Sequence, residues 1–468
     1  MPTAVQVTGA VIGQGGAFGP VEYGGKLYLI SLSAFASNLT DTSEIGIFES
    51  EDNGATWSQT GSTIEIPSAT DAGGDTGPLT VRDPEFLHGC FDVDWPTQPY
   101  AYIMHCGMSG GYGCLFVTRF NASTGDFDDT SAAGPQIPIT GSLGSHDFIG
   151  WMIAQADDRE FGVLANLNTA GSATDRVYAM SLSADLNSWS GRDLVEGQTD
   201  GQYTASGIVR GDDGRVHGWV ERQYVDGFDT AFTMYHTVVI GGGGGIGSEL
   251  QSVLSFFDTS APITGPKIFQ SPYTGGYLDG EVVFICAQPG SGVGTNHHLV
   301  AARATSEDEP SWTVETVDNT SNSENSYWAG VGWDGSTIDV AYNINNSFDT
   351  VRFSTFAGTA WSTPADATED VGPYFVTTQR IAAGLGISFG QNDYDLYFVL
   401  VSGGAQTITG VEPIQTKEQF YNTSGVTGGG LDTCGTPIAV EPSNACNPVD
   451  PDTAIDAPAT CVPQGFSF

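Results

Sequence analysis

Apolar and polar residues alternate along most of the chain in short runs that end at turn residues. Residues 26–33 read Lys-Leu-Tyr-Leu-Ile-Ser-Leu-Ser, and residues 395–401 read Asp-Leu-Tyr-Phe-Val-Leu-Val. A period of two is typical of β-strands that bury one face, and windows with the period of amphipathic helices are scarce. The pattern therefore predicts an all-β protein.

One stretch at the end of a predicted strand, residues 50–57, reads Ser-Glu-Asp-Asn-Gly-Ala-Thr-Trp. Residues 354–361 keep its Ser, Gly and Trp at the same offsets, and residues 183–189 and 306–312 keep Ser, Asp and Trp with one residue fewer. A looser relative spans residues 120–127. A short turn that ends at an aromatic residue thus recurs along the chain.

The aromatic residues of these turns set the length of a repeat. The interval from Trp189 to Trp312 is about twice the interval from Phe127 to Trp189. The double interval predicts a further unit near residue 250. Units of this length, each a small antiparallel sheet, are typical of β-propellers.

We expect seven four-stranded blades, although six or eight also fit the spacing. The last unit lacks a fourth strand, which residues 4–12 can supply, and such closure leaves no long unpaired edge strand. The propeller domain is then expected to cover residues 1–415. The predicted blades are residues 17–67, 82–138, 144–197, 202–257, 265–318, 323–370 and 372–415.

The complete copy, Ser-x-Asp-x-Gly-x-Thr-Trp, resembles the Asp-box of sialidases and related BNR-repeat propellers. The resemblance implies an outer corner between the last two strands of a blade, away from the active centre. In such a corner the Asp accepts backbone N–H bonds, Gly adopts a left-handed conformation and Trp packs beneath the blade. We therefore expect structural roles for Ser50, Asp52, Gly54, Trp57, Trp189, Trp312 and Trp361.

Ligands of propellers normally bind in the central funnel, near the residues that begin each innermost strand. Charged residues at these positions suit a polar ligand such as a sugar, and aromatic residues suit stacking against it. The same side chains are also compatible with a water-filled channel closed by salt bridges. The predicted ligand-binding residues are Arg82, Asp83, His146, Asp147, Tyr203, Lys267, Tyr327, Trp328 and Arg380.

Arg82 and Asp83 are the catalytic candidates. Arg82-Asp-Pro84 resembles the Arg-Ile-Pro of sialidases, which implies an arginine that clamps a substrate carboxylate. It also resembles the Arg-Asp-Pro of invertase-like and arabinanase-like hydrolases, which implies a carboxylate that stabilises the transition state. Hydrolysis needs two carboxylates, but residues 18–20, Phe-Gly-Pro, offer none. An exo-acting glycoside hydrolase is therefore the alternative to a non-enzymatic binding propeller.

The chain is strongly acidic, with 55 Asp and Glu against 14 Lys and Arg and a net charge of −41. Such a surface repels nucleic acid. No apolar run reaches the roughly 20 residues of a membrane span, and no secretory signal is visible at the amino terminus. We expect no cofactor; acidic loops such as Asp212-Asp213-Gly are weak calcium candidates because none has EF-hand spacing.

Residues 416–468 differ from the rest of the chain. A Gly-rich linker precedes a segment with three cysteines and six prolines and almost no strand pattern. Such a segment forms no core of its own, so we expect it either to pack along the propeller, held by a disulfide, or to dock on other subunits of an assembly. With the acidic composition and the lack of a signal, it suggests an extracellular or virion protein, such as a phage tail or capsid-decorating adhesin that binds a surface glycan or receptor.

Overall fold

The computed structural model describes most of the predicted propeller, within the compact unit Met1–Gly403. The predictions about residues 416–468, and the domain boundary before them, lie outside the described residues. No helix of the described part is long and apolar enough to span a membrane. The described residues are 2–11, 17–34, 43–66, 87–109, 112–128, 146–169, 176–186, 188–193, 202–211, 213–226, 229–241, 245–246, 251–258, 275–278, 281–289, 297–305, 312–322, 329–333, 337–344, 350–358, 360–368, 374–390 and 395–401.

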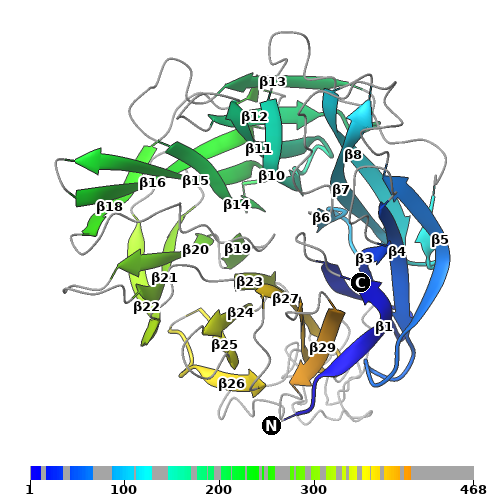
Figure 1. Cartoon of the computed structure of the whole chain (residues 1–468). Helices are drawn as coiled ribbons and strands as arrows, with labels where there is room; N and C mark the ends of the chain where they lie inside the picture. The colour runs from blue at the N-terminus through cyan, green and yellow to red at the C-terminus, as the bar shows by residue number, and fades with distance from the viewer. Residues whose placement is uncertain are drawn as a thin grey trace, which may run out of the picture. The chain divides into compact units, whose positions relative to one another are not determined.

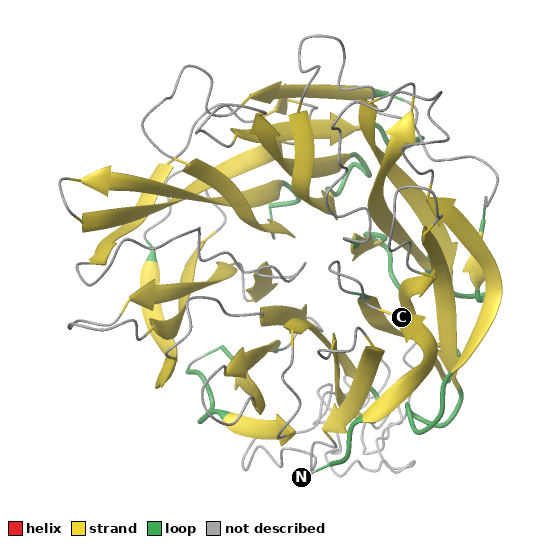
Figure 2. Cartoon of the chain, in the orientation of Figure 1, coloured by secondary structure: helices red, strands yellow, loops and turns green. Residues whose placement is uncertain are grey.

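Seven four-stranded antiparallel blades form a ring, so the predicted β-propeller is confirmed (Figure 1). The described residues contain strands and loops but no helix (Figure 2). The first three blades consist of β2 (Phe18–Tyr23), β3 (Lys26–Ala34), β4 (Ser43–Ser50) and β5 (Ser58–Ile66); β6 (His88–Phe91), β7 (Tyr100–Ser109), β8 (Tyr112–Asn121) and β9 (Asp126–Phe127); and β10 (His146–Gln155), β11 (Phe161–Thr169), β12 (Arg176–Leu182) and β13 (Trp189–Asp193).

The predicted unit near residue 250 is blade 4, and its third strand is the longest in the described chain. This blade contains β14 (Gln202–Arg210), β15 (Val216–Asp226), β16 (Asp229–Gly241) and β18 (Gln251–Asp258), with the short β17 (Gly245–Ile246) beside β16. Blades 5 and 6 consist of β19 (Gly275–Leu278), β20 (Glu281–Pro289), β21 (His297–Thr305) and β22 (Thr313–Asn322), and of β23 (Ala329–Trp333), β24 (Ile338–Ile344), β25 (Thr350–Phe356) and β26 (Ala365–Thr368).

The amino-terminal strand closes the ring, as the sequence predicts. Blade 7 consists of β27 (Tyr374–Ile381), β28 (Gly384–Gly390), β29 (Asp395–Val401) and β1 (Val5–Val11). Val5 pairs with Phe398 of β29, and Val11 pairs with Leu32 of β3 in blade 1. Backbone pairing of the two chain ends thus joins the last blade to the first.

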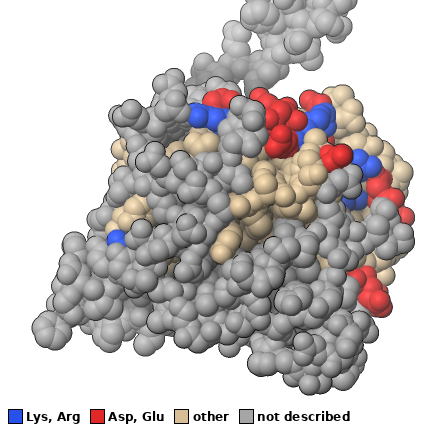
Figure 3. Space-filling model, turned by 90° about the horizontal axis from the view of Figure 1, so that it is seen from above, with Lys and Arg blue, Asp and Glu red and all other residues tan. Residues whose placement is uncertain are grey.

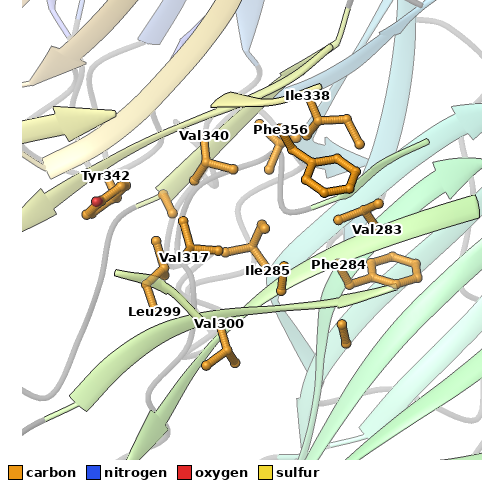
Figure 4. Close-up of a cluster of buried hydrophobic side chains, with 14 of the residues drawn as sticks. Val283, Phe284, Ile285, Leu299, Val300, Val317, Ile338, Val340, Tyr342 and Phe356 are labelled. Carbon is orange, nitrogen blue, oxygen red and sulfur yellow. The ribbon is translucent and has the colours of Figure 1, made fainter. Parts of the chain in front are cut away.

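The hydrophobic core lies between neighbouring blades. Figure 4 shows one such layer, in which Ile285 of β20, Val340 of β24 and Phe356 of β25 are fully or almost fully buried. These alternating residues of facing sheets remove apolar surface from water on both sides, which is the main favourable contribution to folding. The turn residues Trp312 and Trp361 pack against the same cluster.

The complete turn, residues 50–57, connects β4 and β5, the third and fourth strands of blade 1. Asp52 accepts hydrogen bonds from the Thr56 amide (2.8 Å), the Thr56 hydroxyl (2.6 Å) and the Ser50 hydroxyl (2.8 Å). Gly54 has φ +87°, and its amide donates to Ser50 Oγ at 2.8 Å. The Trp57 indole N–H donates to the Gly54 carbonyl at 3.1 Å. These side chains bond within the turn itself.

Candidate functional site

The innermost strands of the seven blades are β2, β6, β10, β14, β19, β23 and β27, and three of them carry four of the predicted ligand-binding residues. His146 and Asp147 are the first two residues of β10, and Tyr203 is the second residue of β14. These positions agree with the expected ring of strand starts. The other predicted strand-start residues, Arg82, Asp83, Lys267, Tyr327 and Trp328, lie outside the described residues.

Tyr203 does not offer its ring as a stacking surface. It is only 4% exposed and belongs to a hydrophobic cluster that includes Leu164 of blade 3 and Val220 of blade 4. The Arg222 guanidinium carbon lies 5.8 Å from the ring centroid. The expected stacking role for Tyr203 is therefore wrong, because the packing of two blades encloses the ring.

Arg380 lies near the end of its innermost strand rather than at the start. β27 begins at Tyr374, and Arg380 is its last residue but one. Its Nε donates to Oδ2 of Asp339 at 2.8 Å, and its Nη2 donates to Oδ1 of the same carboxylate. Asp339 is fully buried and also accepts the Thr355 hydroxyl at 2.5 Å. Arg380 thus joins blade 7 to blade 6 through a bidentate pair.

Two similar ion pairs join blades 2, 3 and 4. Arg159 Nη1 lies 3.0 Å from Asp92 Oδ2, and Arg210 Nη1 lies 2.7 Å from Asp157 Oδ1. All four residues lie in or beside the connection between the first and second strands of a blade, as does Arg380. In the view of Figure 3, several acidic and basic side chains of the described residues lie beside one another along the upper edge. Among the described residues, inter-blade ion pairs therefore lie near the ends of the innermost strands β6, β10, β14 and β27.

Asp92 is, like Asp339, an enclosed carboxylate of these ion pairs. Its side chain is fully buried, and it accepts hydrogen bonds from the Tyr102 hydroxyl and the Asp94 amide, each at 3.0 Å, besides the bond from Arg159. Burial, followed by the negative charge of Asp92, raises the pKa of Tyr102, so its hydroxyl stays protonated and donates. The charge of Asp92 likewise raises the pKa of Arg159.

A further network holds blades 5 and 6 together. Asp318 of β22 accepts a hydrogen bond from the Tyr342 hydroxyl at 2.8 Å and from Arg352 Nη1 at 3.1 Å. Arg352 Nε also donates to Asp366 at 2.7 Å. Asp92, Asp318 and Asp339 are therefore each neutralised by an arginine and bonded to a hydroxyl, which is the environment of a structural carboxylate rather than of a free acid or base.

Blade 4 contains a chain of titratable side chains, of which the two histidines are buried. His217 Nε2 lies 3.1 Å from Asp213 Oδ1, and His217 Nδ1 lies 2.9 Å from His236 Nε2. Burial opposes ionisation of Asp213, but hydrogen bonds from His217 and Arg215 hold its pKa at about 2. Within the described residues no three His, Cys, Asp or Glu side chains gather as a metal site.

The sequence interpretation missed the acidic turns after the innermost strands. They read Asp92-Val-Asp94, Asp157-Asp-Arg159 and Asp212-Asp213. Their recurrence at equivalent places in blades 2, 3 and 4 was the available signal. Of these turns the sequence singles out only Asp212-Asp213-Gly, as a weak calcium candidate. The arginine partners of Asp92 and Asp157 come from the next blade, so no local spacing connects them.

No sequence family and no curated protein matches the chain. Among solved structures, it is similar to the polysaccharide lyase Uly1 (10% identity, 81% of this chain and 88% of that chain, TM-score 0.44). It is also similar to a mutant Aleuria aurantia lectin in complex with alpha-methyl-L-fucoside, with 12% identity over 68% of this chain and 91% of that chain and a TM-score of 0.37. A third similar structure is the GH93 alpha-L-arabinofuranosidase of Fusarium graminearum with arabinobiose, with 10% identity over 85% of this chain and 97% of that chain and a TM-score of 0.39. Similarities at this level assign neither ligand nor reaction to the chain.

Proposed function

We propose that this chain is a surface-recognition β-propeller that binds glycans without hydrolysing them. The observation that supports the proposal is that three buried carboxylates are engaged in ion pairs between blades. Asp92, Asp318 and Asp339 each bind an arginine from a neighbouring blade and hold the blades in fixed positions. A rigid ring of blades favours binding because little conformational freedom is lost when a ligand binds.

The ligand contacts the side chains that begin the innermost strands. Tyr203 and Arg380 leave this set because both are engaged within the protein. The remaining residues combine charged and aromatic groups, which suits the hydroxyl groups and the apolar faces of a sugar. They are Arg82, Asp83, His146, Asp147, Lys267, Tyr327 and Trp328.

The alternative, an exo-acting glycoside hydrolase, requires a second carboxylate near Asp83 at a separation of about 5–9 Å. The enclosed carboxylates Asp92, Asp318 and Asp339 are unsuited to that role, because each already carries a paired charge. None of these three carboxylates therefore supports the hydrolase, and glycan binding without turnover stays our first proposal.

One experiment separates the two functions. The wild type, Asp83→Asn and the matched control Asp52→Asn are tested on a glycan array and on fluorogenic sialosides, arabinosides and fructosides. We expect array binding by the wild type and the control, weaker binding by Asp83→Asn, and no turnover by any of them. If the wild type turns over a substrate and Asp83→Asn does not, the chain is a glycoside hydrolase and the proposal of binding without hydrolysis is wrong.

We further propose that the propeller is carried on a virion, with residues 416–468 attached to other virion subunits. Acidic composition and the Cys- and Pro-rich segment support this placement. Antibodies against the purified chain should label intact particles from the source culture in electron micrographs. Label confined to cell debris would contradict it.

A further inference from the structure

Three half-buried aromatic rings meet where blades 1 and 2 adjoin, beside the connections that follow their innermost strands. The Trp95 ring lies 4.8 Å from the Phe91 ring and 5.9 Å from the Tyr23 ring, centroid to centroid. The Tyr23 and Trp95 rings pack edge to face, an arrangement that keeps both rings in fixed orientations. All three rest against the hydrophobic cluster between blades 1 and 2.

The β6–β7 connection that carries Trp95 is fixed from blade 3. The Val93 amide donates to Gln155 Oε1 at 2.9 Å, and Arg159 bonds to both Asp92 and Asp94. Within the connection, the Trp95 amide donates to the Asp92 carbonyl at 2.9 Å. Trp95 is therefore held in place before any ligand arrives, which lowers the entropic cost of binding.

Polar groups that can bind hydroxyls lie at the edge of these rings. The Asp94 side chain is 56% exposed and the Arg159 side chain 39% exposed, so both have capacity for further hydrogen bonds. Gly24 and Gly25, which follow Tyr23, have no atom within 4 Å of the position a Cβ would take. The turn that follows Tyr23 therefore has open space on the side where these two Cβ atoms would lie.

We propose that Tyr23, Trp95, Asp94 and Arg159 form a subsite for one ring of an uncharged saccharide. The aromatic rings face the C–H groups of the sugar, while the carboxylate and the guanidinium bind neighbouring hydroxyls. A net charge of −41 disfavours anionic sugars and nucleotides. The ligand class rests on the proposed function. The place does not, since it is argued from described residues alone, in the connections that follow β2, β6 and β10.

Saturation-transfer NMR of the full chain with methyl α-D-mannopyranoside, methyl β-D-galactopyranoside and methyl α-L-fucopyranoside tests the subsite. The variants are Trp95→Leu, Tyr23→Leu and Asp94→Asn. The first two remove an aromatic ring, from blade 2 and blade 1, and the third changes a hydrogen-bonding carboxylate of blade 2. Tyr100→Leu is the matched control, because the Arg119 guanidinium already covers that ring at 4.4 Å. Thermal unfolding of each variant shows whether it is folded.

We expect at least one glycoside to bind the wild type and Tyr100→Leu, and about tenfold weaker binding by each of the three test variants. Unchanged binding by folded Trp95→Leu and Tyr23→Leu would overturn the subsite, as would wild type that binds none of the three probes. If Asp83→Asn alone loses binding, the proposed function stands and this subsite falls. If only the three test variants lose it, the subsite stands without the Asp83 site.

Discussion

Asp52 and Asp339 are both carboxylates that accept several hydrogen bonds, but Asp52 stabilises a turn within one blade and Asp339 a contact between two blades. Asp52 is exposed, and its carboxylate accepts hydrogen bonds from Ser50 and Thr56 within its own turn. Asp339 is fully buried and binds Arg380, which lies 41 positions away in the next blade. The first carboxylate shapes one corner of one blade, whereas the second fixes the position of one blade against another.

The degenerate copies of the turn show how little of blade formation depends on Asp52. In blade 3, the Ser188 amide donates to Ser183 Oγ at 3.0 Å and Trp189 still packs beside the blade core. In blade 6, Phe356 stands where the complete turn has Asp, and Ser354 Oγ instead donates to the Ser362 carbonyl at 2.9 Å. In blade 6 the serine and the aromatic residue therefore form the corner without an Asp, whereas the corner of blade 3 keeps Asp185, which accepts the Ser183 hydroxyl at 2.6 Å.

The largest expected effect comes from breaking an inter-blade pair. Asp339→Ala leaves the Arg380 guanidinium without its buried partner and should lower the free energy of unfolding by about 3 kcal/mol. Asp366→Ala, which removes the more exposed partner of Arg352, is the matched control and should cost about 1 kcal/mol. Urea unfolding measures both. A cost for Asp339→Ala no larger than that of the control would show that the inter-blade pair is not the stronger element.

Gly54→Ala should produce the next largest effect, because it strains the complete corner. Gly54 has φ +87°, and a Cβ there would collide with the Phe398 ring of blade 7. We expect a loss of about 2 kcal/mol in the free energy of unfolding. The control is Gly24→Ala, which shares a positive φ but meets open space and should cost about 1 kcal/mol. Equal losses in the two variants would mean that the contact with Phe398 contributes nothing.

A smaller effect is expected from acid, through Asp213. Its pKa is lowered from 3.8 to about 2, so its contribution to stability is complete above its ordinary pKa and is lost as the pH falls from about 4 toward 2. Solvent screening limits the loss to about 1 kcal/mol. Urea unfolding of wild type and Asp213→Asn at several pH values should give curves that converge in acid. A constant difference between them at all pH values would contradict this.

The smallest effect should follow Asp52→Asn. Hydrogen bonds from the Thr56 hydroxyl and amide, and then from Ser50, lower the pKa of Asp52. Because the carboxylate is exposed, its loss should cost no more than about 1 kcal/mol. Asp185→Asn, the equivalent change in the degenerate turn of blade 3, is the control and should cost less. The measurement is again urea unfolding, and a larger cost than for Asp339→Ala would reverse the comparison.

The sequence predicts the blades well because their signals are local. Strand alternation, the turn at residues 50–57 and the double interval before Trp312 all depend on neighbouring residues. The closing role of residues 4–12 follows from counting strands in the last unit. Each of these features can be recognised without knowing which blades pack together.

The candidate site is less predictable because its contacts cross between blades. The start of β14 was expected at Tyr203, but whether that ring faces solvent depends on the packing of blade 3 against blade 4. Arg380 was assigned to the wrong end of β27, because Gln379-Arg380 has the polar character of a strand start and its partner Asp339 lies in another blade. Charged residues that pair across blades have no characteristic separation along the chain, so the sequence does not reveal which of them pair.

The central claim is that the buried carboxylates hold neighbouring blades together. A pair of double-mutant cycles tests it most directly. One cycle combines Asp339→Ala with Arg380→Ala, and the other combines Asp52→Ala with Thr56→Ala; each variant is unfolded in urea. We predict a coupling energy of about 2 kcal/mol or more for the inter-blade pair and about 1 kcal/mol or less for the pair within the turn. A coupling energy near zero between Asp339 and Arg380 would contradict the account.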